Sequence, residues 1–306
     1  MAGVLEGFGI IAVVILAGYL LGRSGVLSPD ARIVLSRFVF FAASPCLLFT
    51  VLATADPQLL LSPLLAVSGL SALAMVLITV AVTRLVWRRN AAQSTVAALA
   101  AGYVNANNIG LPVAIYVLGN PAYPGPVILL QLLLYAPLSL VVLEHSRGRA
   151  SVGGTVLRSL RNPLLVASLL GFLLSVTHVH LPPVVLEPFR LIGGAAVPLM
   201  LMGFGMSLHG QRILEAGTGR RDVVLATTLK LAAMPIAAWL LGAFVFRLDD
   251  ATLHAAVVLA GLPTAQNVLV YATRYDRSVA VARDAVLLTT IGSLPVLLVV
   301  SLLLGG

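Results

Sequence analysis

The sequence predicts an all-α integral membrane protein of about ten transmembrane helices, arranged as two inverted repeats of about five helices each. Three observations predict this fold class: charged residues are scarce, basic connections alternate along the chain, and short motifs recur in the two halves. We expect a first repeat over residues 1–144, a basic cytoplasmic linker over 145–161, and an inverted second repeat over 162–306.

The composition excludes an ordinary water-soluble domain. Charged residues make up 10% of the 306 positions, and the mean hydropathy is +1.05. A soluble domain carries about 25% charged residues, and one membrane-spanning helix needs ~20 apolar residues. The chain therefore has room for about ten spans and little else. The predicted spans are 6–22, 31–54, 62–86, 91–119, 124–144, 162–178, 183–208, 222–246, 250–273 and 280–304.

Basic residues alternate between the connections of these spans. With this division, all but three of the 19 lysines and arginines lie on one side; the exceptions are Arg190, Arg247 and Lys230. Basic connections face the cytoplasm, so both termini are expected outside it. The first apolar run follows Glu6 without a basic segment, which favours an uncleaved helix over a signal peptide.

The net charge of +8 does not indicate nucleic-acid binding, because the basic residues are dispersed between apolar runs. The lone Cys46 excludes an internal disulfide and a cysteine-based metal cluster. We expect no metal site, no cofactor and no nucleic-acid partner.

The tripeptide Gly-Leu-Pro recurs in spans of the same rank within the two predicted repeats. The fourth span contains Gly110-Leu111-Pro112 and the ninth contains Gly261-Leu262-Pro263. Proline removes a backbone donor, and glycine lets the chain leave helical geometry. We therefore expect Gly110, Pro112, Gly261 and Pro263 to break their helices near the middle of the bilayer.

Amide side chains accompany both tripeptides. Asn105, Asn107 and Asn108 precede the first, and Gln266 and Asn267 follow the second. Unpaired backbone groups are tolerated in a membrane only where they line a cavity or meet a partner. The start of a half-helix carries about +0.5 charge and free amide donors. These five residues are the predicted substrate-binding residues, and Tyr103 or Tyr116 could flank them.

The fourth-span segment Asn105–Pro112, which reads Asn-Ala-Asn-Asn-Ile-Gly-Leu-Pro, resembles the corresponding motif of the auxin efflux carrier family. That family includes plant PIN auxin exporters and bacterial carriers of malonate and malate. The segment 261–267 resembles its ninth-span motif, and segments 195–208 and 230–235 resemble its seventh and eighth spans.

The resemblance implies a multi-pass protein of the bacterial inner (cytoplasmic) membrane, with a fold like that of bile acid:sodium symporters. It implies secondary active or facilitative transport of small organic anions, most simply export of carboxylates. The substrate would bind where the broken crossover helices four and nine meet, and an elevator-like motion would carry it across. The partners implied are the anion, the lipid bilayer and, from the plant relatives, a second copy in a homodimer.

Lys230 is the sole lysine and lies within the predicted eighth span. A lysine in mid-bilayer costs ~2.5–3.5 kcal/mol on insertion scales. Two interpretations stay open: a structural donor to the carbonyls of a broken helix, or a role in attracting or coupling the anion.

Three other functions compete with anion transport. A sodium-coupled symporter of the bile-acid type would have the same layout, but no acidic residue lies near the middle of a predicted span. A non-transporting membrane receptor would bind a ligand without flux. An intramembrane enzyme would need an activated nucleophile with a base or an Asp-rich metal motif, and the spans contain neither.

Overall fold

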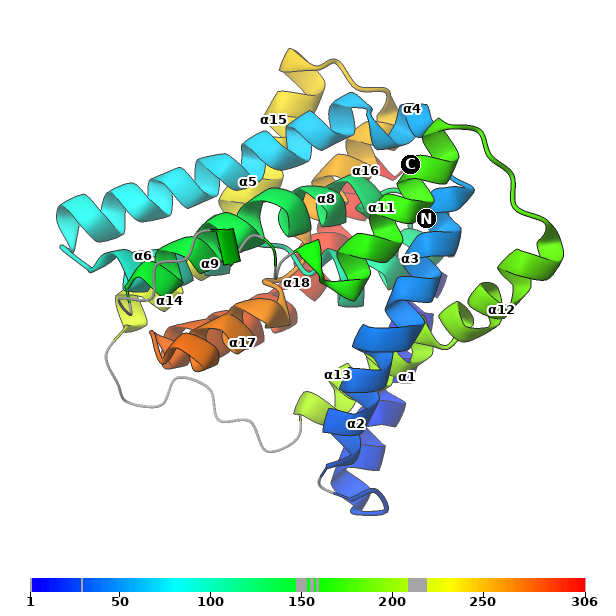
Figure 1. Cartoon of the computed structure of the whole chain (residues 1–306). Coiled ribbons are helices and arrows are strands. Elements are labelled where there is room, and N and C mark those ends of the chain that lie inside the picture. Colours follow the sequence, from blue (N-terminus) through cyan, green and yellow to red (C-terminus); the bar gives the residue numbers. More distant parts are fainter. Residues whose placement is uncertain are drawn as a thin grey trace. The chain divides into compact units, whose positions relative to one another are not determined.

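A computed structural model describes residues 2–28, 30–146, 153–154, 157, 160–208 and 219–305. Within these residues the chain is helical, apart from turns, short extended segments and a β-bridge (Figure 1). The α-helices of the first half are α1 (Ala2–Ser24), α2 (Ala31–Phe38), α3 (Ser44–Ala53), α4 (Pro57–Leu60), α5 (Pro63–Ala81), α6 (Ala91–Gly102), α7 (Leu111–Tyr116), α8 (Pro124–Leu130) and α9 (Ala136–His145). Those of the second half are α11 (Pro163–Val176), α12 (Pro183–Gly194), α13 (Ala196–Leu208), α14 (Arg220–Thr228), α15 (Met234–Leu240), α16 (Asp250–Gly261), α17 (Gln266–Tyr275) and α18 (Val279–Leu304).

The helices are long and apolar enough for an all-helical integral membrane protein. Seven helical stretches in the described part of the chain qualify as spans, and α11 and α16 are shorter apolar helices. Their outward faces carry large aliphatic side chains, such as Leu16, Leu85, Val184 and Leu191. A helix that is apolar on its outer face as well is stable in lipid rather than in water. The seven stretches are Glu6–Ser24, Ile33–Ala53, Pro57–Val86, Pro124–His145, Pro183–Ser207, Arg220–Val245 and Val279–Leu304.

Wider π-helical turns precede four of the prolines inside the helices. A proline lacks the N–H of a regular turn and clashes with the carbonyl four residues earlier. A π-turn widens the helix locally, so the helix continues past the proline with a local change of geometry. The four π-helical segments and the prolines that follow them are Val39–Ala43 with Pro45, Ala106–Gly110 with Pro112, Gln131–Tyr135 with Pro137, and Leu229–Ala233 with Pro235.

The chain divides into two compact units that interleave along the sequence. Unit 1 comprises Met1–Ser62, Asn107–Leu129 and Leu160–Gln211, and unit 2 comprises Pro63–Ala106, Leu130–Ser159 and Arg212–Gly306. This division is spatial, whereas the predicted boundaries at 144 and 162 mark repeats along the chain. The repeat boundaries therefore stay a prediction.

Unit 1 is held together by close approaches between helix backbones. Helices α1 and α13 lie side by side (Figure 1). A methyl group on Gly18 would lie 2.2 Å from the carbonyl oxygen of Met202, and one on Gly205 would lie 2.0 Å from that of Ile15. Small residues at such crossings let membrane helices pack without polar side chains.

Unit 2 is built around α6, which packs against α5, α9, α14 and α18. The second half of α6, from Val96 to Gly102, is buried and consists mainly of alanine. Small side chains on several faces let neighbouring helices approach α6 closely. Asn90 begins the helix with a capping box, in which its side chain accepts from the Gln93 amide and the Gln93 side chain accepts from the Asn90 amide.

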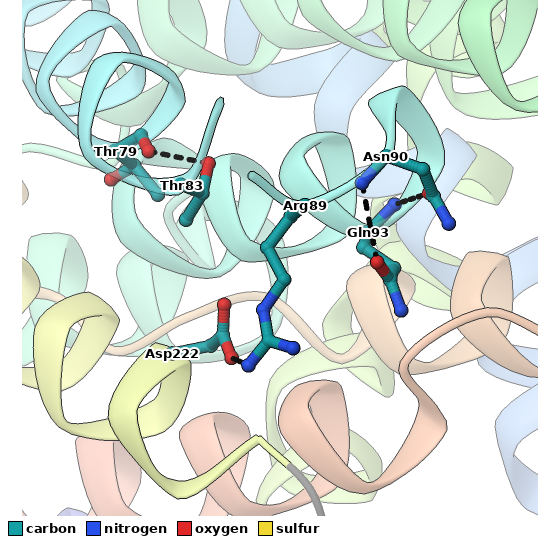
Figure 2. Close-up of polar contacts among 6 residues, drawn as sticks. All are labelled: Thr79, Thr83, Arg89, Asn90, Gln93 and Asp222. Carbon is teal, nitrogen blue, oxygen red and sulfur yellow. Dashed lines mark hydrogen bonds and ion pairs between the residues drawn. The ribbon is translucent and has the colours of Figure 1, made fainter. Parts of the chain in front are cut away.

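Two polar contacts bring helix ends together in unit 2. Arg89 donates to Asp222 at 2.7 Å, which joins the start of α6 to the start of α14 (Figure 2). The Tyr275 hydroxyl donates to Glu144 at 3.1 Å, which joins the end of α17 to the end of α9. Each contact joins two connections that are predicted to lie on the same side of the membrane.

Candidate transport site

Two helices of unit 2 end at a crossing of two backbone segments, residues 103–105 and 262–265. Helix α6 ends at Gly102 and α16 ends at Gly261, and each is followed by a short extended segment. Val104 and Thr264 form an antiparallel β-bridge between these segments. The amide of Asn105 donates to the carbonyl of Pro263 at 2.8 Å, and the amide of Ala265 donates to that of Tyr103 at 3.0 Å.

Thr264 replaces helical hydrogen bonds that the crossing interrupts. Its hydroxyl donates to the carbonyl of Ala100 at 2.6 Å, near the end of α6. Its own amide would serve the carbonyl of Ala260 in a continuous helix, but it donates to the Thr289 hydroxyl at 3.0 Å instead. Both threonines are fully buried. Side chains of unit 2 thus satisfy backbone groups that would otherwise be very costly in a membrane.

The structure corrects the position of the first break. We predicted it at Gly110 and Pro112, but the chain leaves helical geometry earlier, at residues 103–105. Gly110 has ordinary right-handed helical angles, and Pro112 lies in the first turn of α7, after a π-helical segment. The π-helical turn before Pro112 widens the helix and accommodates the missing N–H, so the helix continues through it. By contrast, Gly261 and Pro263 lie at the second break itself.

Polar side chains gather beside the crossing in unit 2. Asn105 is buried within the first extended segment, and Gln266 and Asn267 form the first turn of α17. The Tyr103 hydroxyl lies within hydrogen-bonding reach of the side chains of Asn267 and Tyr271. The crossing therefore carries neutral donors and acceptors, and the first turn of α17 contains no acidic residue.

The start of α17 has free donor capacity. Its N-cap residue, Ala265, has no side chain that could accept from the first amides, and no side-chain cap is formed. The first amides of a helix have no intrahelical partner, and the helix dipole makes this end electropositive. This end of α17 is suited to a group that accepts hydrogen bonds and carries negative charge.

The other two predicted asparagines belong to unit 1. The side-chain amide of Asn107 donates to Asn108 at 2.9 Å and lies 3.5 Å from the Ser44 hydroxyl and 3.8 Å from the sulfur of Met200. The side-chain oxygen of Asn107 is buried and has no hydrogen-bond partner in the described part of the chain. A buried acceptor without a partner is costly and marks a position where a ligand or water could donate. Tyr116, at the end of α7, is exposed.

Lys230 lies within unit 2, in the π-helical segment Leu229–Ala233, and its side chain is fully buried. Its Nζ donates to the carbonyl of Ala260 at 3.0 Å and to the sulfur of Met234 at 3.0 Å. The Ala260 carbonyl is the group left without a helical donor by the break at Pro263. Lys230 therefore supplies the missing bond at the end of α16.

Ionisable residues at the site offer no metal-binding arrangement. In the described residues, no three His, Cys, Asp or Glu side chains are grouped so that they could hold a metal ion.

At the start of α16, outside the apolar part, Asp249 accepts from the amide of Thr252 at 3.0 Å. Hydrogen bonds from Thr252 hold the pKa of the Asp249 carboxyl below its ordinary value of 3.8.

Comparison with known proteins decides the class of this helical membrane protein. The family model described as "Membrane transport protein" matches residues 4–152 and 144–301, which together span nearly the whole chain. The chain belongs to this membrane transport protein family. The transporter is therefore a multi-pass membrane protein of the auxin efflux carrier family and not an enzyme.

Relatives of the transporter include plant and microbial proteins. It is 30% identical over 154 residues to a rice (Oryza sativa subsp. japonica) protein named "Probable auxin efflux carrier component 5b", and the match covers 49% of this chain and 41% of the rice protein. It is 26% identical to an "Uncharacterized transporter" of Methanothermobacter thermautotrophicus, over 93% of each chain. It is 25% identical to the "Uncharacterized transporter YfdV" of Escherichia coli K12, over 87% of this chain and 86% of that protein.

Sequence reasoning missed several residues at these two sites. Thr264 and Thr289 satisfy the break through contacts that no local pattern encodes. Tyr271 is one helical turn beyond Asn267 on α17, so its spacing could have indicated it. Met200, which is more often a packing residue in such a position, contacts both Ser44 and Asn107 in unit 1.

Proposed function

We propose that this transporter carries small organic anions with carboxylate groups across the bacterial inner membrane, most simply as an exporter. The carboxylate binds at the crossing in unit 2, beside Asn105, Gln266 and Asn267. One observation carries this proposal: the first turn of α17 is uncapped, contains no acid, and adjoins a backbone break lined with neutral amide and hydroxyl groups. Amide donors and a positive helix end recognise an anion without an arginine clamp.

The family of the chain agrees with this substrate class. The rice relative is named as an auxin carrier, and auxin is a small organic acid. From this we infer a carboxylate as the common chemical group.

We propose that the helices form about ten spans in two inverted repeats, with cytoplasmic basic connections. Helices α6 and α16 support this layout, because each has 12 residues, begins after a capping side chain and ends in a glycine before an extended segment. The contacts Arg89–Asp222 and Tyr275–Glu144 also support it, since they join connections predicted to lie on the cytoplasmic side.

We propose an elevator-like alternating-access mechanism in which unit 2 is the moving part. Its support is that the backbone groups freed at the crossing meet partners within unit 2: Thr264, Thr289 and Lys230 supply them. A unit that satisfies its own broken helices can move without exposing unpaired backbone groups to lipid.

The test is uptake by the purified protein in liposomes. The probes are radiolabelled malonate, malate and indole-3-acetate, each measured with an imposed potential, a pH gradient or a sodium gradient. We expect saturable flux of at least one carboxylate, and loss of most of that flux in the double variant Asn107→Ala, Asn267→Ala. Gln58→Ala, which removes an exposed amide in α4, is the matched control and should behave like the wild type.

Each outcome of this test has a distinct meaning. Flux that requires the sodium gradient would replace the proposed mechanism with the sodium-coupled symporter. Saturable binding without flux in folded protein would favour a receptor. Wild-type flux in the double variant would show that the asparagines are not substrate-binding residues.

A further inference from the structure

One turn of unit 2 carries arginines that the proposed transport site does not involve. The π-helical segment Val82–Val86 ends the helical stretch Pro57–Val86, which is long and apolar enough to span a membrane. Residues 84–88, which read Arg-Leu-Val-Trp-Arg, lie at this end, and we call them the arginine turn. Under the proposed topology the chain leaves the apolar part of the bilayer here, on the cytoplasmic side.

The two charges of the arginine turn have no counter-ion in the part of the chain that the structure describes. The Arg84 guanidinium donates to the backbone carbonyl of Arg89 at 2.9 Å, and this acceptor carries no formal charge. Arg88 is exposed and makes no ion pair or side-chain hydrogen bond with a described residue. Arg89, by contrast, is paired with Asp222 (Figure 2). The charges of Arg84 and Arg88 are therefore available to an external anion.

Apolar side chains are exposed beside these charges. Leu85 and Val86 are 79% and 69% exposed, and Trp87 is half-buried. Tryptophan is enriched at the membrane–water interface, and basic residues are enriched just beyond it on the cytoplasmic side. Charge for a phosphate and apolar surface for acyl chains thus occur within one turn. This combination suits a phospholipid, whereas a free phosphate would leave the apolar side chains uncovered.

The backbone of the arginine turn holds Arg88 in a conformation that favours glycine. Its φ angle is 52°, in the left-handed region, which is costly for a residue with a side chain. Hydrogen bonds on either side fix this geometry, since the Trp87 amide donates to the Val82 carbonyl and the Arg89 amide donates to the Thr83 carbonyl. An arginine at a position where glycine would be relaxed indicates that its side chain has a role other than folding.

The second half of the chain contains the same turn with different charges, at residues 243–247. Arg247 has a φ angle of 50°, and the amides of Phe246 and Leu248 donate to carbonyls five and six residues earlier, as in the arginine turn. However, Ala243 stands where the arginine turn has its first arginine, and acidic residues follow at 249 and 250. No acidic residue follows the arginine turn before the end of α6.

We propose that the arginine turn binds the headgroup of an anionic phospholipid, with its two arginines at the phosphate and its exposed aliphatic side chains beside the acyl chains. The second turn has the same backbone but no preference for anionic lipid, because it has one arginine followed by two carboxylates. This binding is independent of the transported substrate. Only its assignment to the cytoplasmic leaflet rests on the proposed topology.

The two tryptophans of the chain report on the two turns separately. Trp87 lies in the arginine turn, and the ring centroid of Trp239 lies 5.5 Å from that of Phe244 in the second turn. Each tryptophan is kept alone, in the proteins Trp239→Phe and Trp87→Phe, in vesicles of phosphatidylcholine and anionic phosphatidylglycerol. The measurement is quenching of fluorescence by lipids with brominated acyl chains, with the bromine on one of the two lipids at a time.

We expect phosphatidylglycerol to bind beside Trp87 on the order of tenfold more tightly than phosphatidylcholine, since each basic residue near a membrane surface strengthens binding of anionic lipid by about fivefold. Trp239 should show little preference between the two lipids. This comparison needs no arginine variant, so it decides the question independently of how such variants fold.

Removal of the charges tests the two arginines directly. Arg84→Gln keeps an N–H donor for the Arg89 carbonyl, and Arg88→Gly removes the side chain while relaxing the left-handed backbone. We expect each change to lower the preference at Trp87 by about fivefold and the double variant to abolish it. Arg247→Gly is the matched control, because it relieves the same backbone strain in the second turn and should leave the preference at Trp87 unchanged.

Three results would overturn the inference. The first is equal quenching of Trp87 by the two brominated lipids. The second is an unchanged preference in the folded double variant, which would show that the arginines do not contact the lipid. The third is displacement of brominated phosphatidylglycerol by inorganic phosphate at constant ionic strength, which would show that the turn binds a soluble anion instead.

Discussion

The same tripeptide has two different structures in this transporter. Gly110-Leu111-Pro112 lies within a helical segment of unit 1, whereas Gly261-Leu262-Pro263 ends a helix in unit 2. In the first, a π-turn precedes the proline and lets the helix continue. In the second, Lys230 and Thr289 satisfy the groups that the break frees, the Ala260 carbonyl and the Thr264 amide. A proline in a membrane helix therefore breaks it only where the surrounding side chains provide replacement hydrogen bonds.

The largest expected effect is a difference in transport rate between variants of the two prolines, Pro263 and Pro112. Pro263→Ala gives residue 263 an N–H that can bond the Leu259 carbonyl, and it favours a continuous helix by about 3 kcal/mol on propensity scales. We expect the initial rate of carboxylate uptake to fall by roughly tenfold or more, because the crossing competes with that helix. Pro112→Ala is the matched control and should have a smaller effect. Equal losses in the two variants would contradict the comparison.

The second prediction concerns the replacement hydrogen bond at α6. Thr264→Val keeps the shape of the side chain but leaves the buried Ala100 carbonyl without its hydroxyl donor. We expect the free energy of unfolding in detergent to fall by about 1–3 kcal/mol. Thr95→Val is the control, because the Thr95 hydroxyl bonds the Ala91 carbonyl at an exposed position of the same helix. If Thr264→Val lowered the free energy of unfolding as little as Thr95→Val does, the Thr264 hydroxyl would not be needed at the break.

The third prediction compares the two glycines that end α6 and α16. A methyl group on Gly102 would lie 2.7 Å from Val76 and 2.9 Å from the carbonyl oxygen of Ala72, whereas one on Gly261 would lie 3.3 Å or more from its neighbours. Gly102→Ala should therefore destabilise the protein by about 1–3 kcal/mol, and Gly261→Ala should be nearly neutral. Thermal unfolding of both variants in one detergent tests this difference, and the reverse order would refute it.

The smallest effect is expected at the start of α16. Asp249→Ala removes the side chain that caps the helix and should cost about 1 kcal/mol of unfolding free energy. Because the native pKa of Asp249 is below its ordinary value of 3.8, the contribution of its charge is complete above that value. It is lost as the pH falls through the lowered native pKa.

A comparison with asparagine isolates this charge. Asp249→Asn keeps an acceptor that does not titrate in this range, so the difference between wild type and Asp249→Asn should shrink in acid. The free energy of unfolding of both proteins, measured from pH 3 to pH 7, tests this expectation. A difference that is independent of pH would contradict the assignment.

Much of the helical organisation could be predicted from the sequence. The predicted span 124–144 coincides with the helical stretch Pro124–His145, and 62–86 with most of Pro57–Val86. Hydropathy and turn residues determine these limits locally, since apolar length and Asp-Pro or Asn-Pro turns act over a few residues. The break at Pro263 was likewise predictable from the combination of Gly261 and Pro263.

The position of the first break could not be predicted in the same way. Tyr103 and Asn105 leave helical geometry because residues 263–265 pair with them, and no residue near 103 encodes that pairing. The contact between Lys230 and Ala260 also joins residues far apart in the chain. The identity of the polar residues was thus evident from local motifs, whereas their partners depend on tertiary packing.

The pairing of the two extended segments also constrains how the protein is made. The amide of Asn105 and the carbonyls of Ala100 and Tyr103 bond residues 263–265, which are synthesised much later. Until then, these groups lack the partners that the fold provides, and each unsatisfied group costs several kcal/mol in lipid. The segment around residue 103 must therefore stay in contact with water, the insertion machinery or other backbone groups during biogenesis. The segment can reach its final position in the membrane only after residues 263–265 have been synthesised.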